Sequence, residues 1–430
     1  MAILLTSQPY RRSWTKNSMC FKFETTFGSE GMPANYRIEY ELLMEKNYMQ
    51  NDWEVVSSHR SEPDSNGMLL FDVSELMEDA ILNTFPEPPV PEFNGDFAYV
   101  STAFRRFKVL WAERFGQPPE TLQFEESDIF YAFLGGISDE LFAKGDYFEG
   151  IDAGNSFLSW WPNRKLLGKT QPDYISWFNY TEQPQSVNLR VEVFKDGQKV
   201  IEEIVTRHNV LIVDEDFVVV FPVGPEQMDL NNLGYDVSMY TVQVINGSGV
   251  PLSPKRTYIV DQMYNEVEHN LLYFNGFFQP QVVRCRGQKR TDLIVTKEFT
   301  SRIRRCQPNV LLGTVFQSSS DFDQEFRFRT GYLKKEEIEA LQELMIYNNV
   351  FEITAEGYRP LLVTNGRFST GNELDILRSE EIQAVGSLKK KAYSEDTSNR
   401  IPTEVCTANN WLTDDENCWT TLLNQFWEEP

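Results

Sequence analysis

Segments in which apolar and polar residues alternate recur along this chain, and they restrict it to a strand-rich fold. Residues 36–42 and 187–193 alternate without exception between apolar side chains and polar or charged ones. Because successive side chains of a strand point to opposite faces of a sheet, this period of two predicts strands with one buried face. Asp196-Gly197 follows the second segment and leads into Val200 and Ile201, a sequence typical of a tight hairpin.

The length of the chain indicates more than one such unit. At 430 residues it exceeds the roughly 250–300 residues at which a single hydrophobic core stops growing. Hydrophobic residues make up 41% and charged residues 24%, as in ordinary globular proteins. The expected fold class is mainly β, with tandem immunoglobulin-like β-sandwich modules followed by a small α+β domain and a C-terminal extension. The expected boundaries are 1–175 for a first sandwich with insertions, 176–300 for a second sandwich, 301–395 for the α+β module and 396–430 for the extension.

Two amphipathic helices are expected within this frame. Apolar residues from Val73 to Ile81 recur at helical spacing, and Asp72 precedes them as a capping residue. A later segment places Ile338, Leu341 and Leu344 on one helical face, with charged residues toward the other. Strands predicted at 350–353 and 359–363 complete the small α+β unit.

The two sandwich modules share a pattern of segments. Four pairs align by eye: the hairpins at Tyr36 and Val187, FDVSELM from Phe71 with FPVGPEQM from Phe221, FKVLWAERFG from Phe107 with YTVQVINGSG from Tyr240, and YAFLGG from Tyr131 with YFNGFF from Tyr273. Alternating strands occur in any two sandwiches, so duplication of one module and a chance likeness both stay open.

Charge and cysteine usage narrow the partners and the setting. The formal net charge is −24, and a field of that sign repels phosphate backbones, so nucleic acid is not expected as a partner. No stretch approaches the roughly 18 apolar residues of a membrane span, and the N-terminus lacks the basic region of a secretion signal. The cysteines form no Cys-x-x-Cys pair and are expected to be reduced thiols. They are Cys20, Cys285, Cys306, Cys406 and Cys418.

No catalytic or metal-binding constellation is recognisable in the sequence. The histidines lie far apart and in no ligand spacing; they are His59, His208 and His269. Carboxylate pairs are expected by chance among 64 acidic residues, and the run from Asp321 to Glu325 lacks the glycine and terminal glutamate of a calcium loop. The sequence therefore predicts a protein that is not an enzyme, with no catalytic residues, no cofactor and no metal.

Large aromatic residues mark two candidate binding regions. Trp160 and Trp161 are adjacent and precede Pro162, a pattern that fits a buried anchor more often than a platform for stacking a ligand, and both interpretations stay open. The acidic C-terminal extension carries four large aromatic residues and is expected to dock on a partner or on its own chain. They are Trp411, Trp419, Phe426 and Trp427.

Several of these segments, taken in order, resemble a family of virion and tail structural proteins from phages and tail-like particles of Bacteroidota, including crAss-like and flavobacterial phages. The segments that carry the resemblance are SQPYRRSWTKNSMCFKF from Ser7, FDVSELM from Phe71, FLGGISDEL from Phe133, SFLSWWPNRKLLGKTQPDYISWF from Ser156, RTYIVD from Arg256, LLYFNGFFQPQVVRCRG from Leu271, TGYLKKEEIEALQELM from Thr330 and VFEITAEGYRPLLVTNGRF from Val350.

The resemblance implies a structural subunit of the tail, neck or baseplate of a phage virion, assembled in the host cytoplasm. Its implied partners are other virion or tail subunits, and its implied state is a homo-oligomer in a symmetric ring. The alternative is a carbohydrate- or receptor-binding β-sandwich protein of a particle or cell surface. In that case Trp160, Trp161 and Trp411 would stack on sugar rings.

Overall fold

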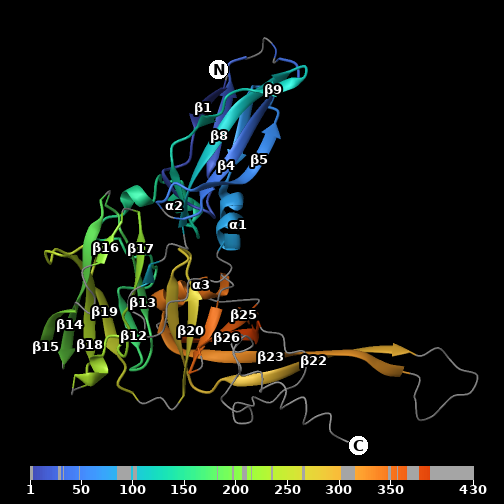
Figure 1. Ribbon diagram of the computed structural model, residues 1–430. Coiled ribbons are helices and arrows are strands. Elements are labelled where there is room, and N and C mark those ends of the chain that lie inside the picture. The colour runs from blue at the N-terminus through green and yellow to red at the C-terminus, as the bar shows by residue number, and fades with distance from the viewer. Residues whose placement is uncertain are drawn as a thin grey trace, which may run out of the picture. The chain divides into compact units, whose positions relative to one another are not determined.

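The protein is mainly β, as predicted, with several sheets and few helices in the computed structural model (Figure 1). The structure describes residues 3–27, 31, 33–47, 49–84, 98–99, 104–181, 183–195, 198–205, 211–214, 216–233, 236–263, 267–301, 315–346, 350–355, 357–365 and 377–387.

A first sandwich forms from the N-terminal part of the chain. One sheet has the order β2 (Arg12–Trp14), β11 (Phe130–Phe133), β8 (Phe104–Gly116), β4 (Arg37–Glu45) and β5 (Trp53–Ser61), with β9 (Pro119–Thr121) and β10 (Glu125–Glu126) also pairing with β8. The facing sheet has the order β1 (Ile3–Ser7), β3 (Cys20–Thr25) and β6 (Met68–Asp72). Their inner faces meet in one core in which Phe21, Ile38 and Val109 are fully buried. The predicted alternation in β4 supplies this core, because Ile38 and Leu42 both point into it.

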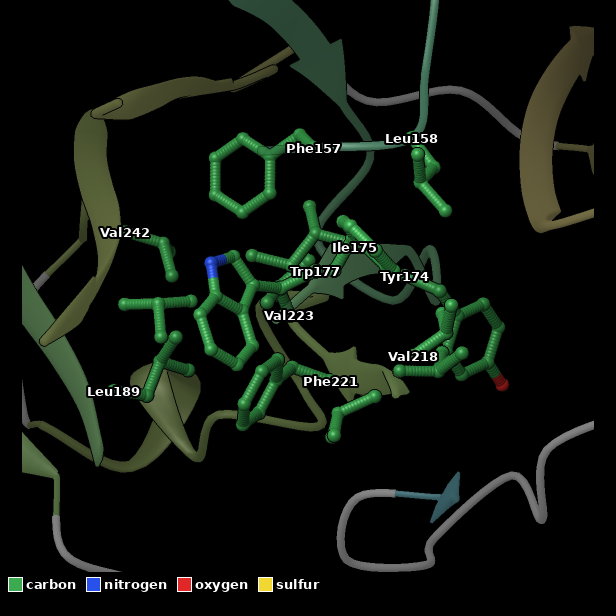
Figure 2. Packing of buried hydrophobic residues seen from close by; sticks show 14 of the residues in the cluster. Phe157, Leu158, Tyr174, Ile175, Trp177, Leu189, Val218, Phe221, Val223 and Val242 are labelled. Atoms are coloured by element: carbon green, nitrogen blue, oxygen red, sulfur yellow. The ribbon is translucent and has the colours of Figure 1, made fainter. Parts of the chain in front are cut away.

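A second sandwich repeats this plan. One sheet has the order β12 (Arg164–Leu167), β19 (Arg256–Val260), β18 (Met239–Asn246), β14 (Gln185–Lys195) and β15 (Gln198–Val205), with β16 (Leu211–Val213) pairing with β14. The other has the order β13 (Tyr174–Phe178), β17 (Val218–Pro222) and β7 (Ala98–Tyr99). Trp177 lies at the centre of their core, surrounded by Leu189, Phe221 and Val242 (Figure 2). Its indole Nε1 donates a hydrogen bond of 3.2 Å to the Leu252 carbonyl, which satisfies the polar atom of a fully buried ring.

The larger sheets of the two sandwiches have the same strand topology. In chain order, β2, β4, β5, β8 and β11 occupy the sheet positions of β12, β14, β15, β18 and β19, and both short edge strands, β2 and β12, pair in parallel. This agrees with the predicted alignment of the two hairpins and of β6 with β17, and it is the arrangement that a duplication predicts. The alignment of Tyr131 with Tyr273 was wrong, because the counterpart of β11 is β19.

A third sheet follows, packed on a helix. Its order is β21 (Pro280–Arg286), β20 (Glu268–Phe274), β24 (Val350–Thr354), β25 (Gly357–Val363), β26 (Leu377–Gly386), β23 (Val315–Lys334) and β22 (Arg290–Ser301). The buried face of α3 (Lys335–Ile346) carries Ile338, Leu341 and Leu344, as predicted. The strand near Leu271 was assigned to the second sandwich from the sequence, but β20 pairs with β24 in this third sheet.

The first predicted helix is α1 (Ser74–Thr84). Asp72 acts before it as expected, because its Oδ1 accepts a hydrogen bond of 3.0 Å from the Ser74 amide. Val73, Met77 and Ile81 are fully buried at successive turns.

The chain divides into two compact units, one of residues 1–292 with 324–387 and the other of residues 293–323 with 388–430. In the second unit, the described residues are the outer parts of β22 and β23, which are called the arm below.

Candidate functional site

A pocket of about 530 Å³ lies where the first sandwich passes into the second. Residues 141–163 supply most of its lining, and Pro254 and Arg256 supply the rest. The aromatic side chains in its wall are Tyr147, Phe157, Trp160 and Trp161. This volume lies within the range of sites that hold small ligands.

The two adjacent tryptophans have different roles. Trp161 is 5% exposed, and its Nε1 donates a hydrogen bond of 2.6 Å to the Tyr273 hydroxyl, so it is the buried anchor that the sequence favoured. Trp160 is 45% exposed and packs on Phe277, with ring centroids 4.9 Å apart. Only Trp160 therefore presents a large accessible aromatic surface at the pocket.

Arg256 is the most unusual side chain of the pocket, and sequence reasoning missed it. It is 3% exposed, and its Nε has no hydrogen-bond partner. The part of the chain that the structure describes places no carboxylate within ion-pairing distance of it. β19 sets this position, because Arg256, Tyr258 and Val260 alternate onto the inner face of their sheet.

Asp173 is a buried acid that already pairs with Lys165. Lys165 Nζ lies 2.7 Å from Asp173 Oδ1, and both side chains are almost fully buried. Burial lowers the pKa of Lys165, while the charge of Asp173 opposes that shift and the charge of Arg256 adds to it. Asp173 is thus held by Lys165, and no carboxylate among the described residues forms an ion pair with Arg256.

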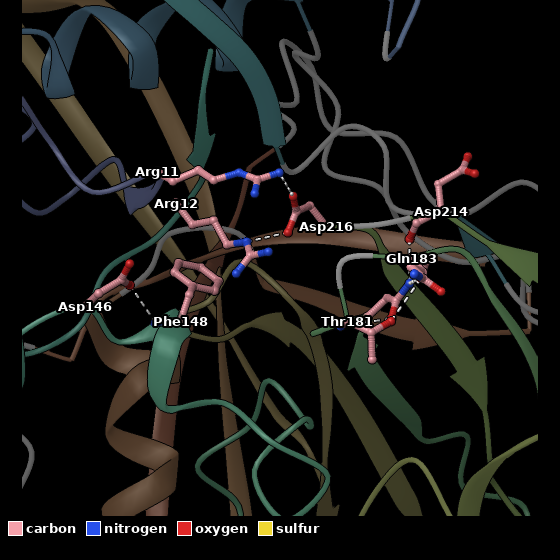
Figure 3. Close-up of polar contacts among 9 residues, drawn as sticks. Arg11, Arg12, Asp146, Phe148, Thr181, Gln183, Asp214 and Asp216 are labelled. Carbon is pink, nitrogen blue, oxygen red and sulfur yellow. Dashed lines mark hydrogen bonds and ion pairs between the residues drawn. The ribbon is translucent and has the colours of Figure 1, made fainter. Parts of the chain in front are cut away.

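The outer wall of the pocket carries one acid and one further cation. Asp146 Oδ1 accepts a hydrogen bond of 2.8 Å from the Phe148 amide (Figure 3), and burial raises the pKa of Asp146. Lys144 is exposed at the rim. The described residues of the lining therefore include two cations, Lys144 and Arg256, and one carboxylate, Asp146.

An ion-pair cluster fixes β2 beside the second sandwich. Figure 3 shows the guanidinium groups of Arg11 and Arg12 directed at the carboxylate of Asp216, which is fully buried. The Arg11 contact measures 3.4 Å. Charged hydrogen bonds of this kind are what make a buried carboxylate tolerable, so the cluster is structural support rather than a reactive site.

The other candidates from the sequence are placed as follows. His59 lies 2.6 Å from the Ser57 hydroxyl, and His269 lies 3.3 Å from Glu352. No group of His, Cys, Asp or Glu that could hold a metal ion occurs among the described residues. His208 and the aromatic residues of the C-terminal extension, Trp411, Trp419, Phe426 and Trp427, lie outside the described residues. No described helix is long and apolar enough to cross a membrane.

A second feature of interest is the apolar face of the arm, defined by Leu293, Val295 and Phe299. These side chains are 52%, 46% and 64% exposed. They lie at positions 293, 295 and 299 of β22 and so share one face of that strand, on which the exposed Lys297 also lies. Ile294, 44% exposed, lies on the opposite face. The arm therefore presents more apolar surface on one face than a solvated strand requires.

Comparisons with known proteins give only distant structural likenesses. No family model matches the sequence, and no curated protein matches it. Trypsin-activated alpha-2-macroglobulin from Escherichia coli is similar at 10% identity over 77% of this chain and 20% of that chain, with a TM-score of 0.20. The Salmonella enterica SafA pilin in complex with the SafB chaperone is similar at 10% identity over 60% of this chain and 96% of that chain, with a TM-score of 0.18. Dimeric latent PorU from Porphyromonas gingivalis is similar at 10% identity over 83% of this chain and 33% of that chain, with a TM-score of 0.18.

The chain spans about a fifth of the length of that macroglobulin. TM-scores this low do not establish a common fold with any of the three proteins.

Proposed function

We propose that the chain is a structural subunit of a phage virion, in the tail, neck or baseplate, and that it acts through protein–protein contacts. The resemblance of its ordered segments to virion and tail proteins of Bacteroidota phages motivates this assignment. The tandem sandwiches supply a rigid scaffold, and other virion subunits and further copies of the chain in a symmetric ring are its partners.

The apolar face of the arm is the observation that carries the proposal. A two-stranded ribbon is marginally stable by itself in water, and apolar side chains clustered on one exposed face mark a surface that a partner covers. Burying Leu293, Val295 and Phe299 would contribute roughly 1.5–3 kcal/mol for each side chain that becomes fully covered. An assembly subunit gains this energy when it meets its neighbour, whereas a permanent monomer would not.

Mass spectrometry of purified virions, with copy-number estimation, tests the proposal. The expected result is that the chain is present at a copy number that matches a ring symmetry. Sedimentation analysis of the purified chain should show self-association or association with a co-expressed tail protein. A chain that is absent from virions and strictly monomeric in solution contradicts the proposal.

Carbohydrate recognition is the second candidate function, and the exposed ring of Trp160 at the mouth of a 530 Å³ pocket favours it. Aromatic rings that present a face to solvent suit the apolar faces of sugars, while nearby amide and hydroxyl groups can bind their hydroxyls. A glycan array probed with the intact chain tests this candidate. Binding that Trp160→Ala abolishes supports it, and an array without hits removes it.

A further inference from the structure

We infer that the pocket at Trp160 binds an acidic sugar, a monosaccharide unit with a carboxylate, whose ring lies on Trp160 and whose carboxylate pairs with Arg256. The inference rests on the second candidate function, carbohydrate recognition, and narrows it to one class of ligand. It adds a charge requirement that neutral glycans do not meet.

Arg256 carries a buried positive charge that no described carboxylate pairs with. A buried charge is costly unless it is paired and hydrogen-bonded, yet Arg256 is 3% exposed, its Nε has no hydrogen-bond partner, and no described carboxylate forms an ion pair with it. Asp173 is held by Lys165 at 2.7 Å and does not fill this role. A ligand carboxylate matches the planar fork of a guanidinium with two parallel hydrogen bonds. The pocket is thus prepared for an anion at Arg256.

The aromatic wall of the pocket favours a sugar over a simple anion as the ligand. Trp160 offers an accessible ring face that an inorganic ion or a small carboxylate would not use. Asn155 and Asn163 also line the pocket and supply donors and acceptors for hydroxyl groups. An exposed aromatic platform, polar side chains and a buried cation together suit a ligand that is a ring, carries hydroxyls and has a carboxylate.

The other charged side chains of the pocket are compatible with a ligand that carries a single negative charge. Asp146 is the one carboxylate among the described residues of the lining, and burial raises its pKa. Lys144 adds a second cation at the rim. The net charge of −24 opposes long polyanions, so an acidic sugar unit fits better than a nucleic acid or a highly charged polysaccharide.

Saturation-transfer NMR and calorimetry on the intact chain test the inference. The acidic probes are D-glucuronate, D-galacturonate and N-acetylneuraminate. D-Glucose and D-galactose are matched neutral probes, and acetate is a carboxylate without a ring. At least one acidic sugar should bind at least about tenfold more tightly than its neutral counterpart and than acetate, as expected for a charged hydrogen bond. This comparison uses the native chain and does not depend on any variant.

Three variants then locate the binding. Arg256→Gln should reduce affinity for the acidic sugar about tenfold or more and leave the weak affinity for the neutral sugar unchanged. Trp160→Ala should weaken both sugars and leave acetate unchanged. Tyr332→Ala, which removes a 73% exposed aromatic ring outside this pocket, is the matched control and should change neither. If Arg256→Gln does not fold, Arg256→Lys keeps the charge, loses the planar fork and should bind the acidic sugar more weakly than native.

The outcomes separate the inference from the function on which it rests. Equal binding of acidic and neutral sugars, lost in Trp160→Ala, overturns the charge requirement and leaves carbohydrate recognition standing. If acetate binds as tightly as the acidic sugars, the ligand need not be a sugar, and the pocket is only an anion-binding site. No binding of any probe overturns both the inference and the second candidate function.

Discussion

Glu343 of α3 is a buried carboxylate that the fold pairs on only one of its two oxygens. Its Oε1 accepts a hydrogen bond of 2.8 Å from the Gly276 amide, but its Oε2 has no partner. Burial raises the pKa of Glu343 from 4.5 to about 7. By contrast, Glu45 is fully buried and its pKa is lowered, because the hydrogen bonds from Arg106 and from the Asn51 amide outweigh the effect of burial.

The raised pKa of Glu343 predicts a loss of stability as the pH rises. The folded state binds more protons than the unfolded state between pH 4.5 and 7, so the contribution of Glu343 is fully present below pH 4.5 and is lost as the pH passes 7. A shift of this size corresponds to about 3 kcal/mol. Urea unfolding at pH 5 and pH 8 should show that Glu343→Gln gains stability relative to the native chain at pH 8.

The matched control for this prediction is Glu339→Gln on the same helix, where the side chain is half-exposed. Its difference from the native chain should not change between the two pH values. A Glu343→Gln variant whose difference from native is the same at pH 5 and pH 8 would contradict the raised pKa.

For individual residues, the sequence predicts which apolar side chains face the core but not which polar side chains are buried. The spacing of Ile338, Leu341 and Leu344 predicted the buried face of α3, because helical geometry fixes it. Glu336, Glu337 and Glu339 were placed toward the solvated face, and none of them is buried. The spacing did not single out Glu343, which is buried where it accepts a hydrogen bond from the Gly276 amide, 67 positions away in the chain. The different exposures of Trp160 and Trp161 depend in the same way on Phe277 and Tyr273, which local sequence does not identify.

Among the elements, the turn at Gly276 joins parts that are distant in sequence. Its carbonyl accepts a hydrogen bond of 2.8 Å from the Gly136 amide, after β11, and its amide donates to Glu343 of α3. Gly135 has a φ of +110°, and a Cβ at this position would lie 2.1 Å from the Gly276 carbonyl oxygen. Only glycine allows this approach.

Gly135→Ala is therefore expected to destabilise the protein more than backbone strain alone would. Left-handed strain costs about 1–2 kcal/mol for a non-glycine residue, and displacing the Gly276 backbone adds roughly 1–3 kcal/mol. Gly145→Ala is the matched control, because Gly145 has a φ of +124° and open space at its Cβ. Chemical denaturation should place Gly135→Ala clearly below Gly145→Ala in stability, and equal losses would contradict the close approach.

The arm makes a second prediction at the level of elements. Leu293→Ser combined with Val295→Ser and Phe299→Ser replaces its apolar face, and the partner surface that covers this face in the proposed assembly should lose its contact. Self-association or incorporation into particles should fall at least about tenfold, as expected from losing a few kcal/mol of buried apolar contact. Analytical ultracentrifugation and particle assembly assays measure this. The melting behaviour of the sandwiches should not change, since the arm belongs to a separate unit.

Ile294→Ser is the control for the arm, because it removes an equally exposed apolar side chain from the opposite face of the same strand. It should leave association close to native. If the triple variant associates as well as Ile294→Ser does, the apolar face is not the contact surface and the proposal of assembly through it fails.

The pairing of strands shows which parts of the fold local sequence can predict and which it cannot. The alternation of Val187–Val193 and the turn after it predicted β14 and β15 and their pairing, because hairpin contacts are local. The continuous apolar run Leu271–Phe274 predicted a strand, but it did not reveal that the partner of β20 is β24, since that pairing joins Leu272 to Phe351 across a long stretch of chain. The two matching sandwich topologies were detectable only as a loose likeness of segments.

For the molecule as a whole, the net charge of −24 sets a condition on any assembly of identical copies. Like-charged copies repel one another, while an apolar contact is not weakened by screening. Raising the salt concentration shortens the Debye length from about 10 Å at 0.1 M to about 3 Å at 1 M and so removes most of the repulsion. Self-association of the native chain should therefore strengthen with sodium chloride concentration, as sedimentation velocity at 0.05 M and 0.5 M would measure. Dissociation at the higher salt concentration would mean that ion pairs, and not the apolar face of the arm, hold the copies together.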